Sequence, residues 1–203
     1  MNKHTSPFRY PSEIHVRKHA PKGYKQWNDF RDWLRDEFDF RCVYCLCRET
    51  WGRRRATWVV EHVIPRTISP DLALDYNNLV YSCASCNSAK SSKNIPDPCK
   101  CMYGDLIYVS EDGCIHALNA EGKKLIRVAA LDEGDLNKFR KMIIDLIKEY
   151  KKSDREKYKT WMGFPDDLPD LSKKKVPENG NPESYKICRY YQRAMANLPD
   201  IYE

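Results

Sequence analysis

Two pairs of closely spaced cysteines are the strongest chemical signal in the sequence. Cys42 and Cys45 form one C-x-x-C motif, and Cys83 and Cys86 form a second motif, separated from the first by 37 residues. Each motif presents two thiolates from one tight turn, and four soft sulfur ligands suit tetrahedral zinc. We therefore predict a closed, structural Zn²⁺ site that ties two distant segments together. Redox-active or simply buried thiols are the alternative.

The other cysteines give a weaker signal. Nine cysteines are an odd number for a closed disulfide framework, and in a reducing compartment paired motifs bind metal more often than they form disulfides. Cys47 and Cys188 are most simply explained as small, buried apolar side chains. A second zinc site would have to use four irregularly spaced residues around an expected hairpin, which speaks against it: Cys99, Cys101, Cys114 and His116.

An acid and a histidine stand side by side in an apolar run between the two cysteine motifs. The run covers residues 58–65, and Glu61 and His62 interrupt it. Neighbouring side chains on a strand point to opposite faces, so the two residues can serve one site only if the strand bends or ends there. Pro65 favours an ending nearby. Taken alone, such a pair is typical of an exposed strand.

The acid and the histidine are accompanied by further elements. Asn77-Asn78-Leu79 follows them, and Cys86-Asn87-Ser88-Ala89-Lys90 indicates the start of a helix directly after the second cysteine motif. In this arrangement residues 40–93 resemble the HNH nuclease family. Its ββα-metal motif has a cysteine knuckle, an acid-His-x-x-Pro strand, an Asn-Leu pair and a C-x-x-C-[His/Asn]-x-x-Lys helix. The resemblance implies an endonuclease that hydrolyses phosphodiester bonds.

The resemblance also assigns roles to single residues. It makes His62 the general base for the attacking water, a role that suits an imidazole near physiological pH. Asn78 would hold the loop that aims His62. Glu61 and Asn87 would be the protein ligands of one catalytic Mg²⁺ or Mn²⁺ ion. Lys90, one helical turn after Asn87, would contact a backbone phosphate.

Two positions depart from the family pattern. Glu61 stands where Asp is more usual, and its extra methylene moves the carboxylate by about a bond length, enough to change metal preference or to make the contact water-mediated. Asn87 stands where many members have His, which is a familiar variant. The departure at Glu61 therefore bears on direct metal binding more than the departure at Asn87.

Positive charge is concentrated in two segments. The formal net charge is +6, and it falls to about +4 when four thiolates bind one zinc ion. Residues 1–25 hold six Lys or Arg against one acid, and residues 41–55 hold five Arg against one acid. Such clusters can follow a phosphate backbone, so nucleic acid is the expected partner, with DNA favoured; solvated surface loops are the alternative. The predicted nucleic-acid contacts are Arg53, Arg54, Arg55, Lys90 and Lys93.

Helices are expected on both sides of this core. Apolar residues at three- and four-residue steps predict an amphipathic helix over residues 24–40, with its aromatic face in the core. The same spacing predicts helices over residues 135–151 and 185–195. Residues 161–182 are rich in Pro, Asp and Lys and are expected to form a loop.

A short β-meander is expected between the core and the second helix. Residues 106–109 and 114–118 flank Asp112-Gly113, where positive φ is easiest, and predict a hairpin. Glu121-Gly122 indicates a second turn before a third strand at residues 124–129.

These elements predict an α+β chain in three parts. Residues 1–40 form a basic arm and a helix, residues 41–95 the HNH core with its zinc knuckles, and residues 96–203 a C-terminal extension with the meander and helices. No apolar run approaches the roughly 20 residues that span a bilayer, and the first residues lack the apolar core of a signal peptide. We expect a soluble, cytoplasmic protein with no membrane contact.

Three functions fit this pattern. The first is an active nuclease, the second a zinc-held nucleic-acid-binding module, and the third a nuclease subunit that is silent until a protein partner, such as an ATPase, engages it. A zinc-held binding module has no need for the four polar residues of the HNH pattern, which favours hydrolysis. Residues 163–171 show a weaker resemblance to tails of bacterial HNH proteins linked to restriction and phage defence.

Overall fold

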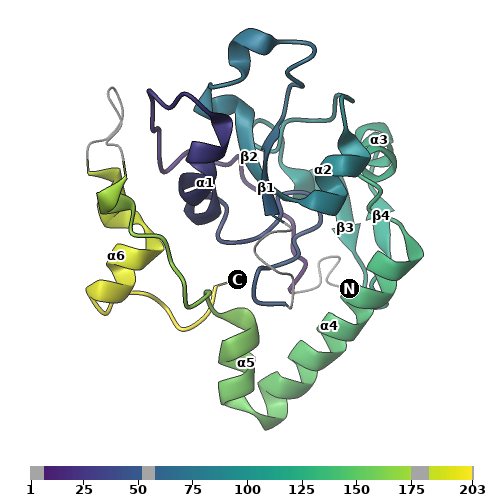
Figure 1. Ribbon diagram of the computed structural model, residues 1–203. Coiled ribbons are helices and arrows are strands. Elements are labelled where there is room, and N and C mark those ends of the chain that lie inside the picture. The colour runs from purple at the N-terminus through teal and green to yellow at the C-terminus, as the bar shows by residue number, and fades with distance from the viewer. Residues whose placement is uncertain (1–6, 52–57, 175–182, 203) are drawn as a thin grey trace.

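Short strands and helices in mixed order make up the described part of the chain. The computed structural model describes residues 7–51, 58–174 and 183–202. Its strands form two separate antiparallel pairs, with helices around them (Figure 1), which confirms the predicted α+β class. In chain order the elements are α1 (Arg31–Glu37), β1 (Trp58–His62), β2 (Leu79–Cys83), α2 (Ala84–Lys90), β3 (Ile107–Val109), β4 (Ile115–Ala117), α3 (Ala120–Val128), α4 (Gly134–Ser153), α5 (Arg155–Met162) and α6 (Arg189–Ala194).

The two strands and the helix of the predicted ββα unit lie together. β1 pairs with β2 in an antiparallel register that sets Trp58 opposite Cys83 and His62 opposite Leu79. α2 follows β2 without a break and packs against both strands (Figure 1). The C-terminal end of β1 therefore lies beside the start of β2, and α2 covers the pair.

The helix before this unit is shorter than the predicted one over residues 24–40. A 3₁₀ turn at Trp27–Phe30 precedes α1, and Asp39 and Phe40 follow it with φ of 51° and 57°. Two successive residues in the left-handed region cannot continue an α-helix. The predicted aromatic face is buried in the core except at Trp27, which is half-buried. The buried members are Phe30, Trp33, Leu34 and Phe38.

The N-terminal segment packs on the core. The Tyr10 hydroxyl is buried and donates to the Tyr44 carbonyl at 2.7 Å. The Arg17 guanidinium lies between the rings of Phe38 and Tyr76, with its Cζ 5.1 Å and 5.0 Å from their centroids. Arg17, one of the basic residues predicted to form a basic arm, therefore contacts the aromatic core.

The predicted hairpin is present. β3 and β4 pair through Ile107–Ala117 and Val109–Ile115, and Gly113 in the connecting turn has φ +84°. Only glycine adopts this conformation without strain, which is why Asp-Gly marked the turn correctly.

The prediction of a third strand at residues 124–129 is wrong, because most of this segment belongs to α3. The Asn119 side chain accepts a hydrogen bond from the Gly122 backbone N–H at 2.9 Å and caps the helix. A Cβ on Gly122 would lie 2.0 Å from the Leu106 carbonyl oxygen. Gly122 thus serves the close approach of α3 to the hairpin and not a turn.

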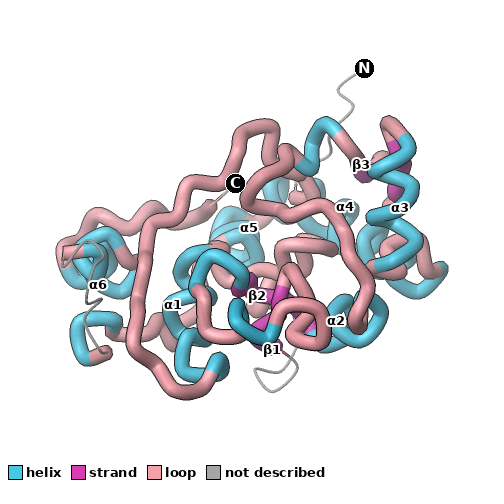
Figure 2. Tube along the Cα trace, turned by 90° about the horizontal axis from the view of Figure 1, so that it is seen from above, coloured by secondary structure: helices cyan, strands magenta, loops and turns pink. Residues whose placement is uncertain are grey.

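Beyond α3, the part of the C-terminal extension that the structure describes contains three more α-helices. α4 confirms the helix predicted over residues 135–151, and α5 begins in a stretch for which no helix was predicted, capped by Asp154, which accepts from the Lys157 N–H at 3.0 Å. α6 is shorter than the helix predicted over residues 185–195, and it lies next to α1 (Figure 1 and Figure 2). There the Arg189 N–H donates to Asp36 Oδ1 at 2.6 Å. Within the described ranges, no helix is long and apolar enough to cross a membrane.

Candidate active site

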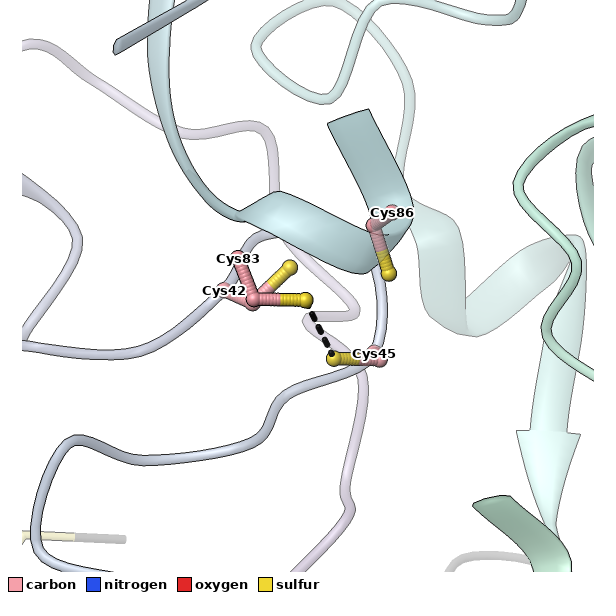
Figure 3. Close-up of side chains that lie close together, drawn as sticks. All are labelled: Cys42, Cys45, Cys83 and Cys86. Atoms are coloured by element: carbon pink, nitrogen blue, oxygen red, sulfur yellow. Dashed lines mark hydrogen bonds between the residues drawn. The ribbon is translucent and has the colours of Figure 1, made fainter. Parts of the chain in front are cut away.

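Four buried cysteines meet at the base of the ββα unit. Cys42 and Cys45 come from the loop after α1, Cys83 ends β2, and Cys86 lies in the first turn of α2. Their sulfur atoms all lie within 4.8 Å of one another (Figure 3), and the Cys45 and Cys83 sulfurs are 3.8 Å apart. Four sulfur ligands at about 2.3 Å from one tetrahedral ion are about 3.8 Å apart, so the cluster fits zinc.

The remaining cysteines follow their predicted places. Cys47 and Cys188 are buried among apolar side chains. The four residues of the conceivable second zinc site do not gather in the described part of the chain, where the cluster above is the single group of metal-binding size. His116 instead hydrogen-bonds Ser110 Oγ through Nε2 at 2.9 Å and stacks on Tyr108.

Glu61 and His62 occupy the last two positions of β1. Both side chains are largely buried, at 6% and 8% exposure. Side chains of neighbouring strand residues normally face opposite ways, yet both residues line one cleft of about 730 Å³. The strand ends at His62, as the predicted bend required. Asn87, half-buried on α2, lines the same cleft.

Asn78 does not line the cleft and anchors the loop after β1 instead. Its Oδ1 accepts from the Ile64 N–H at 2.8 Å, and its Nδ2 donates to the carbonyls of Ile64 at 3.1 Å and Leu72 at 3.3 Å. The amide therefore joins the two ends of the loop between residues 64 and 72. The loop continues into Ala73, which contacts His62.

The contact with Ala73 fixes the proton on His62. Nε2 of His62 lies 3.1 Å from the Ala73 carbonyl oxygen, which can only accept, so Nε2 is the protonated nitrogen of the neutral ring and Nδ1 is the free base. Burial lowers the pKa of His62 below its ordinary value, and the nearby charges of Arg66 and Lys90 act in the same direction; the hydrogen bond to Ala73 opposes this shift but does not outweigh it. The ring is therefore neutral near pH 7.

Lys90 does not make the phosphate contact that was predicted for it. The lysine is fully buried, and its Nζ donates to Glu61 Oε1 at 2.7 Å and to the His62 carbonyl at 2.8 Å. A buried, engaged ammonium cannot reach a phosphate on the surface, so the predicted phosphate contact is wrong for Lys90. Burial raises the pKa of Glu61, and the hydrogen bond and charge of Lys90 oppose that rise. Lys93, by contrast, is exposed beyond α2.

Trp27 and Arg66 also line the cleft, although the sequence motifs did not mark either as a site residue. Trp27 faces the cleft from the 3₁₀ turn before α1, with its ring centroid 5.9 Å from that of His62. Arg66 follows Pro65 and lies over the Trp27 ring, with Cζ 4.0 Å from the centroid. Trp27 carried the signal of an aromatic at the edge of a helix pattern, whereas nothing in the sequence around Arg66 distinguished it.

The predicted contacts Arg53, Arg54 and Arg55 fall outside the described residues. A second cleft of about 700 Å³ lies between α5 and the C-terminal segment. Its Lys159 is paired with Asp200 at 2.8 Å.

Most of the residues that line the first cleft belong to a segment that matches a known protein family. Residues 42–93 match the family described as HNH endonuclease. The chain is also 29% identical over 109 residues to the Septu protein PtuB of Bacillus thuringiensis. That similarity covers 51% of this chain and 41% of the relative, so the chain matches less than half of the relative's length. The resemblance recognised over residues 40–93 is confirmed.

Proposed function

From the HNH endonuclease domain that residues 42–93 form, we propose that the chain hydrolyses phosphodiester bonds of nucleic acid, with DNA as the expected substrate, and that it uses a divalent metal ion. The observation that supports this most is the shared cleft of Glu61, His62 and Asn87. The three residues come from the end of β1 and from α2, on either side of 24 intervening residues. A zinc-held binding module has no need for this convergence.

The oxygen donors of the cleft fit a hard cation. Glu61 offers a carboxylate and Asn87 an amide oxygen, the ligand types that Mg²⁺ and Mn²⁺ prefer. A bound ion would stabilise negative charge on the phosphate and on the departing oxygen. Lys90 holds Glu61 Oε1 at 2.7 Å and so fixes the carboxylate at the cleft wall.

His62 is the proposed general base. Its Nδ1 is free to take a proton from water, because Nε2 donates to the Ala73 carbonyl. Asn78 fixes the loop that ends at Ala73, and it is in this way a positioning residue for the imidazole. Zinc at the four cysteines would hold β2 and α2 to the loop after α1, and with them the Asn87 side of the cleft.

The biological setting is a further part of the proposal. The similarity to a Septu protein, together with the tail resemblance at residues 163–171, favours a role in bacterial phage defence. A protein partner is proposed as well, such as an ATPase subunit. Exposed apolar side chains on and beside α6, far from the cleft residues in sequence, are suited to a protein contact: Ile187, Tyr190 and Met195.

A plasmid-cleavage assay tests the proposed chemistry. We expect the full chain to nick or cut plasmid DNA with Mg²⁺ or Mn²⁺, and His62→Ala to lower the rate by about 10²- to 10⁴-fold because the general base is lost. His116→Ala is the matched control, since His116 is an exposed histidine outside the cleft. Its rate should equal that of the wild type.

Two outcomes would contradict the proposal. Equal cleavage by the wild type and His62→Ala would assign the activity to another site or to a contaminant. A zinc-loaded, folded wild type that cuts neither DNA nor RNA with either ion would refute the claim that this chain is sufficient for hydrolysis.

A further inference from the structure

One wall of the cleft carries a stacked pair of side chains, Arg66 over Trp27. Arg66 Cζ lies 4.0 Å from the centroid of the Trp27 ring, within the range of a cation–π contact. The same ring makes a T-shaped contact with the His62 imidazole, with the ring centroids 5.9 Å apart and an interplanar angle of 69°. The stacked pair therefore adjoins the proposed general base, and both members line the cleft.

Trp27 is in this position because the chain has not yet entered α1. Its neighbours in the aromatic pattern, Phe30, Trp33 and Leu34, are almost fully buried, whereas Trp27 stands in the 3₁₀ turn and is half-buried. Arg66 is exposed on the loop that Asn78 anchors. A large aromatic ring left at the edge of a polar cleft, under a guanidinium, is more than the core requires.

The two side chains together place a positive charge over an aromatic ring at the cleft wall. A guanidinium is planar, stacks on aromatic rings and nucleobases, and donates hydrogen bonds from its edge to phosphate oxygens. The Trp27 ring restrains Arg66 in a stacked position, which lowers the entropy lost when a third plane is added. In a double helix both faces of a base are covered by its neighbours, so only an unpaired base can offer a free face.

We propose that Arg66, backed by Trp27, is a stacking site for an unpaired base next to the scissile phosphate, so that the preferred substrate is single-stranded or locally unpaired nucleic acid. This inference rests on the proposed function, because it places the base relative to the phosphate at Glu61 and His62. Asn28 and Thr67 also line this part of the cleft and carry polar groups that can hydrogen-bond base edges.

Binding measurements on the full chain test this site without requiring hydrolysis. Fluorescence anisotropy without added Mg²⁺ or Mn²⁺ would give the affinity for a labelled single-stranded oligonucleotide and for a fully paired duplex containing the same strand. The informative variants are Trp27→Leu, which removes the ring, and Arg66→Lys, which keeps the charge and removes the plane. Zinc content and thermal unfolding would be compared with those of the wild type.

The expected result is selective loss of single-strand binding. Loss of one base-stacking contact should weaken affinity for the single strand by about tenfold or more in both variants, and affinity for the duplex by about twofold or less. Single-strand affinity of Arg66→Lys equal to that of the wild type would overturn the proposal, because charge alone would then suffice. Equal weakening for single strand and duplex would also overturn it, because the pair would then contact phosphates only.

The plasmid assay separates this inference from the proposed function. If the wild type and His62→Ala differ in cleavage while both stacking variants bind like the wild type, the stacking site fails and the nuclease stands. If no substrate is cut but the stacking variants lose single-strand binding selectively, the nuclease proposal fails and the stacking site stands.

Discussion

Two buried glutamates serve the molecule in opposite ways. Glu37, at the end of α1, is surrounded by donors that fix the N-terminal segment, whereas Glu61, at the end of β1, has Lys90 as its charged partner and faces a cleft. The donors to Glu37 are His15 Nε2 at 2.7 Å, the Lys18 N–H at 2.8 Å, the His19 N–H at 2.9 Å and the Tyr76 hydroxyl at 3.1 Å.

The pKa values of the two carboxyl groups diverge accordingly. Burial raises the pKa of both, but at Glu37 the hydrogen bonds from His15 and the two backbone N–H groups outweigh burial, and the pKa lies below its ordinary value. At Glu61 burial outweighs Lys90, and the pKa lies above its ordinary value. A carboxylate that only fixes structure is saturated with donors, while one beside a cleft keeps oxygen lone pairs for a ligand.

The largest expected effect comes from a change in the cysteine cluster, because the cluster holds the elements around Glu61 and its cleft in place. Cys86→Ser should abolish stable folding, because structural zinc sites contribute roughly 10–16 kcal/mol of binding free energy to folding. Zinc content and thermal unfolding measure this. A Cys86→Ser protein that keeps wild-type thermal stability would rule out a structural role for the cluster, and Cys188→Ala, at a buried cysteine outside the cluster, is the control for loss of a buried thiol.

A smaller effect is expected when each glutamate loses one partner. Lys90→Met leaves a buried carboxylate without its charged partner and should cost about 3–5 kcal/mol of unfolding free energy. His15→Ala removes one donor of several and should cost about 1–2 kcal/mol. Denaturant unfolding compares the two. An equal or smaller cost for Lys90→Met would mean that Glu61 is not held by Lys90, and the contrast between the glutamates would lose its basis.

The smallest effect is the acid dependence of stability. The pKa of Glu37 is lower in the folded than in the unfolded chain, so in acid the unfolded state binds more protons and stability decreases as the pH is lowered. The contribution of Glu37 is fully present above the ordinary glutamate pKa of about 4.3 and is lost as the pH falls through the lower folded value. The difference in unfolding free energy between wild type and Glu37→Gln should therefore shrink below that pH. A difference that grows toward acid would reverse the sign of the argument.

The features that the sequence could predict are local in spacing. The C-x-x-C pairs, the strand ending after Glu61-His62 and the Asp112-Gly113 turn each follow from a few neighbouring residues, and the structure contains all three. Whether a segment forms a strand or a helix also depends on contacts with residues far away in the sequence. The sequence predicts a turn at Gly122, but the glycine is needed because the Leu106 carbonyl lies too close for a side chain, and only tertiary packing brings that carbonyl there.

The cleft shows the same limit. The motif places Lys90 one turn after Asn87 and predicts a phosphate contact, but the structure buries Lys90 against β1 and directs its ammonium to Glu61. Arg66 and Trp27 are 39 positions apart and meet only when the loop after β1 folds over the turn before α1. Charge counts and periodicity contain no information about such a contact.

The most direct test of the account compares Glu61→Gln with Glu37→Gln in plasmid cleavage and thermal unfolding of the zinc-loaded protein. Gln at position 61 keeps an oxygen that can accept from Lys90 but loses the negative charge that suits a divalent cation. We expect Glu61→Gln to retain cooperative folding and to lose cleavage. Glu37→Gln should lose about 1–3 kcal/mol of stability and keep its cleavage rate at temperatures where it is folded. Cleavage by Glu61→Gln at the wild-type rate would contradict the assignment of the active site.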